Sequence, residues 1–307
     1  MPTDERTGLG TEALLLVWAA RRTGLLEALL SSAGTPTEAA AATEVSEPGA
    51  RRVIGALADL GFLESVDGEY EPTNRALGML AKRDVRSVGP IPHALDATDD
   101  LVGLPGTLEG GVPPERGDDR EANALGAHYA TDEATVRACT TAAVRAVPGA
   151  GSVVDLCGGS GVYAAEFAAR GLDATLVTSP TAAELFGRVH GDGVALHAGA
   201  PSALDGGFDL AFLGDALSGM APAEARATLA VGADLLDGDG AVVAADVFDD
   251  GSEAAVAADV RGLASGHGGA HDPDAAREWA VEAGLADVGI APIPGTDRRA
   301  LVGSVGE

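Results

Sequence analysis

The chain has 307 residues, enough for two domains, and its 46% hydrophobic residues provide a sizeable core and exclude wholesale disorder. Its formal net charge of −27 disfavours non-specific nucleic-acid binding, because phosphate contacts need clustered Lys and Arg. Two cysteines, Cys139 and Cys157, exclude a disulfide framework.

The chain opens with a polar segment, MPTDERTGLG, which lacks the apolar core of a secretory signal. The first apolar run, ALLLVWAA, is shorter than the roughly 20 residues that cross a bilayer as a helix. We therefore expect a cytoplasmic protein that does not associate with a membrane.

Residues 1–86 are predicted to form a winged helix-turn-helix domain. The stretch TEALLLVWAARRTGLLEALL has leucines at helical spacing. The next segment, TPTEAAAATEV, places Thr35 and Glu38 at the spacing of a capping box, and EPGARRVIGALADLGFL reads as a third amphipathic helix. Asp67 and Gly68 then mark the turn of a hairpin. Helices followed by a hairpin are the order of elements in a winged helix.

Residues 87–147 are interpreted as a helical connector that forms a wall of a substrate pocket. In residues 148–307 the apolar strands SVVDL, DATLVT, FDLAFL and GAVVAADVF alternate with alanine-rich helices. Continuous apolar strands separated by helices indicate a parallel sheet covered on both faces. The predicted fold class is α/β: a doubly wound, Rossmann-like domain preceded by the α+β winged helix.

The loop DLCGGSG at residues 155–161 follows an apolar strand and opens a helix, as cofactor loops do at the carboxyl ends of strands. It formally fits the dinucleotide fingerprint, which alone is a weak signal. A diphosphate here would face Asp155 with no Lys or Arg before Arg170, and repulsion at ~4–6 Å is on the order of several kcal/mol. A ligand with an ammonium and a sulfonium would be attracted instead. The alternative is a helix-entry turn with a capping aspartate.

Together these motifs resemble the class I S-adenosylmethionine-dependent methyltransferases, specifically small-molecule O-methyltransferases with an N-terminal winged-helix dimerisation domain. The resemblance spans nearly the whole chain. The motifs, in the family's order, are VVDLCGGSG, TLVTSP, HAGA, FDLAFLGDALSGM, LLDGDGAVVAADVF and HGGAHDPDAAREWAVEAGL. The resemblance implies S-adenosyl-L-methionine as cofactor, a small-molecule substrate and a homodimer formed through the N-terminal domain.

The resemblance also assigns cofactor contacts to positions of this chain. They are Asp155, Cys157, Gly158, Gly159 and Gly161 near the methionine part, Thr178 and Ser179 near the ribose, Gly199 and Ala200 beside the adenine, and Gly214 and Asp215 near the methionyl carboxylate or sulfonium.

Four positions depart from the family pattern. Cys157 replaces the first glycine of the loop, and Ala200 replaces an acidic residue after the third strand. Thr178 stands where an acidic residue normally takes both ribose hydroxyls, and losing charge-assisted bonds costs roughly 1–3 kcal/mol. Ser218 stands in place of the general-base histidine of Leu-His-x-Trp. A serine hydroxyl alone cannot accept a proton at neutral pH, so no base is identified there.

His271, in GGAHDPD, is the candidate substitute base, because the family places a pocket-lining acidic residue near this position. A solvated loop histidine is the alternative reading. His128 and Tyr129 are read either as pocket lining or as packing residues. His267 and His271 are four residues apart but lack a third ligand, so no metal site is predicted.

Two further functions stay open: a winged-helix regulator whose cofactor-sensing domain has lost its chemistry, and an enzyme of the same fold that uses the cofactor for other chemistry. Arg51 and Arg52 would begin the recognition helix. Residues 1–86 hold 13 acids and 9 bases, a net of −4, against −23 for the remainder. This lower acidity fits DNA contact or burial in a dimer interface, and we favour the dimer.

The acidic residues are scattered, and Lys82 is the only lysine. This composition resembles that of proteins from salt-accumulating halophilic archaea, where multimolar salt mutes self-repulsion. The alternative is an acidic binder of cations or basic partners.

Overall fold

The computed structural model describes residues 7–80, 89–113, 117–187, 189–190 and 193–306. It divides into two compact units, residues 1–99 and 100–307, and the division falls within one helix, α8 (Ile91–Gly110). The predicted domain boundary at residues 86–87, and Lys82, lie outside the described residues.

The N-terminal unit consists of short helices followed by a two-stranded hairpin, as predicted. The predicted capping box forms: the Thr35 hydroxyl accepts the Glu38 N–H, and the Glu38 carboxylate accepts the Thr35 N–H. The hairpin turns at Asp67 and Gly68, which both have positive φ, as the favoured two-residue hairpin turns require. The elements are α2 (Thr11–Arg22), α3 (Leu25–Ser31), α4 (Pro36–Ala42), α5 (Glu47–Asp59), β1 (Leu63–Val66), β2 (Glu69–Pro72) and α6 (Asn74–Leu80).

The connector is more helical than its proline and glycine content suggests. Helix α8 contains Pro105 and ends at Gly110, and it is followed by α9 (Arg120–Tyr129) and α10 (Glu133–Ala146). Asp100 of α8 forms an ion pair with Arg120 at the start of α9, and both side chains are largely buried. Helix α9 is thereby fixed at its first turn.

The C-terminal unit is built on a seven-stranded sheet of order β5-β4-β3-β6-β7-β9-β8. The first five strands are parallel, whereas β9 pairs antiparallel with β7 and β8. The antiparallel pair was not foreseen from the sequence. The strands are β3 (Ser152–Asp155), β4 (Asp173–Thr178), β5 (Val194–Ala198), β6 (Phe208–Gly214), β7 (Leu236–Asp246), β8 (Leu285–Pro292) and β9 (Arg299–Val305).

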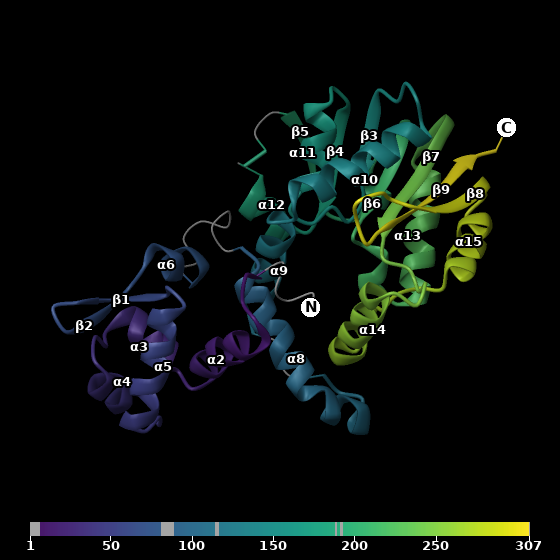
Figure 1. Ribbon diagram of the computed structural model, residues 1–307. Coiled ribbons are helices and arrows are strands. Elements are labelled where there is room, and N and C mark those ends of the chain that lie inside the picture. Colours follow the sequence, from purple (N-terminus) through teal and green to yellow (C-terminus); the bar gives the residue numbers. More distant parts are fainter. Residues whose placement is uncertain (1–6, 81–88, 114–116, 188, 191–192, 307) are drawn as a thin grey trace. The chain divides into compact units, whose positions relative to one another are not determined.

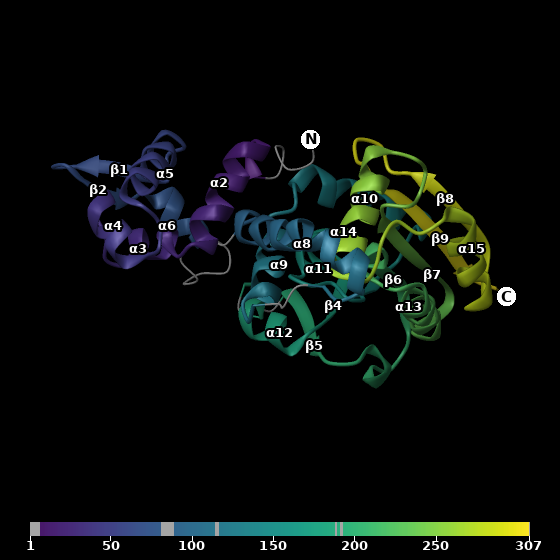
Figure 2. The ribbon, with the colours of Figure 1, turned by 90° about the horizontal axis from the view of Figure 1, so that it is seen from below.

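Helices cover both faces of this sheet, as predicted (Figures 1 and 2). Consecutive strand residues alternate between two cores: Val153 packs with α10 and α11, and Val154 packs with α13 and α15. The period of two fixes which residues face each layer. The helices are α11 (Val162–Ala169), α12 (Pro180–Phe186), α13 (Pro222–Asp234), α14 (Glu253–Ser265) and α15 (Pro273–Glu282), and short 3-10 turns are η2 (Pro201–Ala203) and η3 (Leu217–Gly219).

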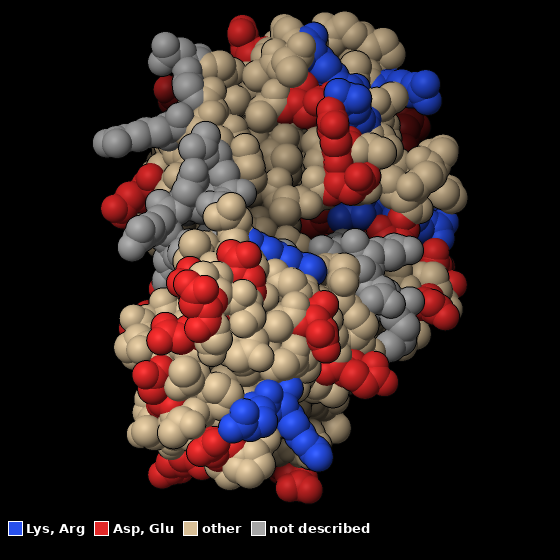
Figure 3. Space-filling view, turned by 60° about the vertical axis from the view of Figure 1, so that its left-hand side comes forward, with Lys and Arg blue, Asp and Glu red and all other residues tan. Residues whose placement is uncertain are grey.

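Acidic side chains are scattered over the face shown in Figure 3, with few basic side chains between them. Within the described residues, every helix is too short or too polar to cross a membrane. In the same residues, no group of three or more His, Cys, Asp or Glu side chains could hold a metal ion.

Candidate active site

The carboxyl ends of β3 and β6 are neighbours in the sheet, although β4 and β5 separate them along the chain. The chain runs outward in opposite directions from this point, which makes it the switch point where ligands of open α/β sheets bind. Three predicted site segments meet here: the loop after β3, the residues after β4, and the residues after β6.

Asp155 lies beneath the glycine loop and is fully buried. Its Oδ2 accepts the N–H of Ala164, in the first turn of α11, at 3.1 Å, while its Oδ1 has no hydrogen-bond partner among the described residues. Burial raises the pKa of Asp155 to about 8. The predicted repulsion of a diphosphate assumed an ionised Asp155, so at pH 7 that repulsion is weaker than the sequence suggested.

The loop above Asp155 is tightly packed. A Cβ on Gly158 would lie 2.4 Å from Leu176 Cδ1 and 2.5 Å from Asp155 Oδ2, so only glycine fits there. Cys157 has a φ of +57°, a conformation that favours glycine. Its backbone is therefore strained at the entry of the loop.

Two histidines hold the next turn of the loop. His128 of α9 places Nδ1 2.8 Å from the Ser160 hydroxyl and accepts the Ser160 N–H at 3.3 Å. A Cβ on Gly159 would lie 3.1 Å from the same nitrogen. His190 Nε2 lies 2.6 Å from the Ser160 carbonyl oxygen. His128 therefore packs directly on the predicted cofactor loop. Its contact is at Ser160, which lies between Gly159 and Gly161.

The residues predicted near ribose and adenine lie at the ends of β4 and β5. The Thr178 hydroxyl donates to the Gly159 carbonyl at 2.8 Å, so its proton is already committed within the protein. Ser179 caps α12 and donates its hydroxyl to Glu121 of α9 at 2.5 Å. Gly199 donates its N–H to the Thr178 carbonyl. Gly199 and Ala200 are both exposed, at the surface beside the end of β4.

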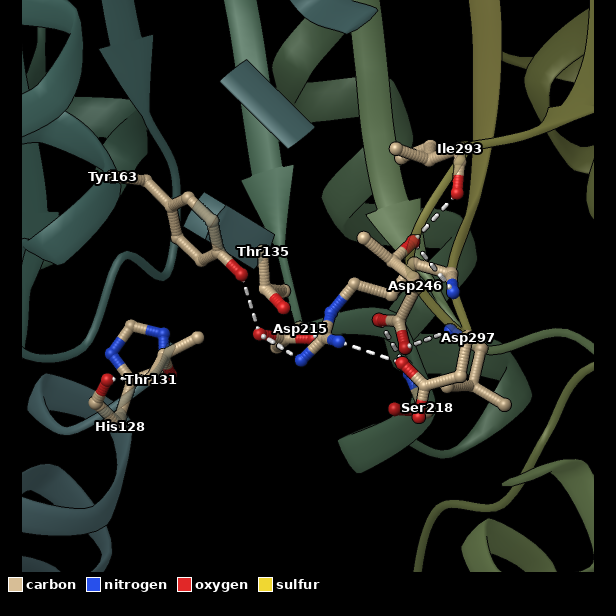
Figure 4. Close-up of polar contacts among 12 residues, drawn as sticks. His128, Thr131, Thr135, Tyr163, Asp215, Ser218, Asp246, Ile293 and Asp297 are labelled. Atoms are coloured by element: carbon tan, nitrogen blue, oxygen red, sulfur yellow. Dashed lines mark hydrogen bonds and ion pairs between the residues drawn. The ribbon is translucent and has the colours of Figure 1, made fainter. Parts of the chain in front are cut away.

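An ion pair dominates the end of β6. Arg298 lies in the turn between β8 and β9. It donates two hydrogen bonds to Asp215, from Nε to Oδ1 at 2.6 Å and from Nη2 to Oδ2 at 3.1 Å. The Tyr163 hydroxyl donates to Asp215 Oδ2 at 2.7 Å, and the two groups point toward one another in Figure 4. Burial alone would raise the pKa of Asp215, but Arg298 holds it below its usual range. Gly214 leaves room for Tyr163, because a Cβ would lie 2.6 Å from its ring.

The turn η3 contains Ser218, which the sequence resemblance predicts to stand in place of a general-base histidine. Its N–H donates to Asp246 Oδ2 at 3.1 Å, at the carboxyl end of β7 (Figure 4). Burial, and then the nearby Asp215, raise the pKa of Asp246, against the hydrogen bonds from Ser218. His271 Nε2 lies 2.9 Å from the Leu217 carbonyl oxygen, which only accepts, so Nε2 carries a proton. His271 is 8% exposed, so its reading as a solvated loop histidine is wrong.

Sequence reasoning missed Arg298, Tyr163, Asp246 and Glu121 as members of this site. Asp246 could have been found, because a carboxylate directly follows the apolar strand GAVVAA and must lie at the same edge of the sheet as Asp155. No local pattern points to Arg298, which reaches the site only through the antiparallel pair β8–β9.

No protein-family model and no curated protein matches this sequence. Solved structures match over nearly the whole chain. A structure of PigF with SAH is 17% identical, with a TM-score of 0.71, over 99% of this chain and 98% of that chain. Human N-acetylserotonin methyltransferase in complex with SAM is 17% identical, with a TM-score of 0.64, over 96% and 94%. The mitomycin 7-O-methyltransferase MmcR is 20% identical, with a TM-score of 0.64, over 95% and 94%.

The structural neighbours across the full length therefore include small-molecule methyltransferases, and the resemblance seen in the sequence is confirmed at the level of the fold. At identities below 25%, the likeness establishes the fold and leaves the activity to the residues of the site.

Proposed function

We propose that this protein is an S-adenosylmethionine-dependent methyltransferase that acts on a small molecule at an oxygen atom. The observation that carries the proposal is the pairing of a full-length methyltransferase fold with a buried carboxylate oxygen, Oδ1 of Asp155, that has no hydrogen-bond partner among the described residues. A buried polar atom without a partner is costly, and the cationic amino-acid group of the cofactor, or a water that it orders, would satisfy it.

The residues present fit this cofactor. Asp155 and the loop at Gly159 and Gly161 would hold the methionine part, the segment after β4 the ribose, and Gly199 with Ala200 the adenine. When bound, the cofactor would supply an electrophilic methyl group on a sulfonium. This chain's own contribution is to hold the acceptor oxygen in line with that methyl and to exclude water.

The acceptor's proton has two candidate destinations in this site. One is Nδ1 of His271, because its Nε2 is occupied by Leu217. The other is Asp246, reached through Ser218, because burial raises the pKa of this carboxyl group and brings it closer to the range of a general base. An acceptor that is already ionised, such as an acidic phenol, needs neither group.

Calorimetry in high potassium chloride, with S-adenosylmethionine and with S-adenosylhomocysteine, tests the proposal. We expect both to bind, and Gly159→Arg to abolish binding, because any side chain here meets His128. The matched control is Gly193→Arg, at an exposed glycine with open space around it. The absence of heat with either ligand would refute the proposal.

Methyl transfer is then measured with a panel of phenols and other hydroxyl compounds. Binding of the cofactor without methyl transfer to any acceptor would favour the regulator, or the enzyme of the same fold with other chemistry.

We propose further that the protein is a homodimer formed through residues 1–86 and that it works in concentrated salt. The scattered acids and the lower acidity of the N-terminal segment support this. Light scattering in high potassium chloride should give the mass of a dimer, and a monomer at all protein concentrations would contradict it.

A further inference from the structure

The end of β4 lacks the acidic residue that the resemblance predicts for the ribose, yet a carboxylate lies there. Ser179 directly follows β4, and its hydroxyl donates to Glu121 Oε1 at 2.5 Å. Glu121 comes from a different element, the first turn of α9, 58 residues earlier in the chain. Position 178 itself is a threonine, and its hydroxyl already donates a hydrogen bond to the Gly159 carbonyl oxygen.

Helix α9 is held firmly in this place. Besides the Glu121 contact, its last residue, Tyr129, packs on Phe186 of α12 with ring centroids 5.3 Å apart. His128 contacts Ser160 in the loop after β3. Glu121 and His128 are seven residues apart, which is about two helical turns or ~10 Å along one face. One face of α9 therefore runs from the end of β4 to the cofactor loop.

A carboxylate has two oxygens, both of which accept hydrogen bonds, and two adjacent hydroxyl groups can donate to both at once. Glu121 is exposed, so its carboxylate is accessible at the end of β4. Gly199, next to the predicted adenine position, donates its N–H to the Thr178 carbonyl at 3.1 Å, which brings that segment to the same edge. If a nucleoside lies between the loop after β3 and β5, its sugar lies next to the Glu121 carboxylate.

We infer that Glu121 binds the vicinal diol of the cofactor ribose, in place of the acidic residue missing from position 178. The inference rests on the proposed function, since it concerns the same cofactor. It assigns to the connector helix a binding role that is independent of any substrate, and it explains how the chain tolerates Thr178.

The test compares the affinities of S-adenosylhomocysteine and its 2′-deoxyribose analogue, measured by calorimetry in high potassium chloride. Wild-type protein should prefer the ribose form by about tenfold or more, as expected for charge-assisted bonds to a diol. Glu121→Gln keeps the size of the side chain but removes its charge. It should weaken the ribose form by about tenfold and reduce the preference below about threefold.

The matched control is Glu133→Gln, which removes an exposed glutamate from the first turn of the neighbouring helix α10. It should change neither affinity nor preference. A merely structural Glu121 that braces α9 would, when replaced, weaken both analogues equally and lower the melting temperature. That result, an unaltered preference in Glu121→Gln, overturns the inference and leaves the proposed function intact. Failure of wild-type protein to bind either analogue overturns both.

Discussion

Replacing Arg298 by methionine should be among the most damaging single changes in the C-terminal unit. The Arg298 side chain is 6% exposed and forms two bonds to Asp215. Methionine retains the apolar stem but leaves the carboxylate of Asp215, which is 22% exposed, without its cation. Breaking a fully buried pair from one side costs about 3–5 kcal/mol, and for this largely buried pair we expect the lower end, about 3 kcal/mol. At ~2–4 °C per kcal/mol for a domain of this size, the melting temperature should fall by roughly 10 °C.

The assay is urea unfolding followed by circular dichroism, with Arg137→Met as the control. Arg137 pairs with Glu133 on the surface of α10, with side chains 60% and 73% exposed, so its loss should cost less than about 1 kcal/mol. Adding Asp215→Asn to Arg298→Met removes the stranded charge and should recover a large part of the loss. Equal effects of Arg298→Met and Arg137→Met would refute the reasoning.

The pH dependence gives an independent check. The pKa of Asp215 is held low in the native protein, so its contribution is present above the unfolded-state pKa and is lost as the pH falls through the native value. Without Arg298, burial raises that pKa, and protonation removes the buried charge. The loss in the free energy of unfolding caused by Arg298→Met should therefore become smaller as the pH falls from 7 toward ~4.

Three further changes test the glycine loop. Cys157→Gly should stabilise the protein by about 1 kcal/mol in urea unfolding, because φ of +57° suits glycine, whereas Cys157→Ala should not; equal effects of the two would contradict the strain. Gly158→Ala should lower the free energy of unfolding by about 1–3 kcal/mol and weaken cofactor binding, because the added Cβ overlaps Asp155 and Leu176. Gly193→Ala, which has open space around it, should be close to neutral. A Gly158→Ala protein that is stable and binds the cofactor would disprove the packing. Burial raises the pKa of Asp155 to about 8, so Asp155 must release a proton before it can bind a cationic ligand as a carboxylate. The affinity for that ligand should therefore rise at least tenfold between pH ~6 and ~8. A flat dependence of affinity on pH, or one that Asp155→Asn leaves unchanged, would rule this out.

Linkage also applies to Asp155 in the free protein. Its native pKa lies above the unfolded value of about 3.9, so its stabilising contribution is complete below that value and is lost as the pH rises toward 8. Melting temperatures of the free protein should therefore decline across this window by more than those of Asp155→Asn.

Local chemistry predicted the elements whose signals lie within a few residues. The Thr35 capping box, the Asp67 turn and the loop opened by Asp155 depend on neighbours in the chain, and each was found where its pattern indicated. Helix α8 was harder, because Pro105 and flanking glycines favour a loop on intrinsic propensity, whereas the structure forms a helix there.

Contacts between distant segments could not be predicted. The partner of Asp215 is 83 residues away, on a strand turn whose antiparallel placement no periodicity reveals. Glu121 and Ser179 are likewise 58 residues apart. The apolar rhythm shows which residues face a core, but it does not show which side chains meet at the edge of the sheet.

The position of β9 between β7 and β8 has a consequence for biosynthesis. A ribosome finishes the loop after β3 and all five parallel strands before it translates Arg298 and β9. Until then the nascent sheet has an open edge at β7, and Asp215 lacks its cation. The ion pair of Asp215 and the pairing of β7 with β9 therefore form only after these residues are made, and until then the growing chain relies on its apolar layers.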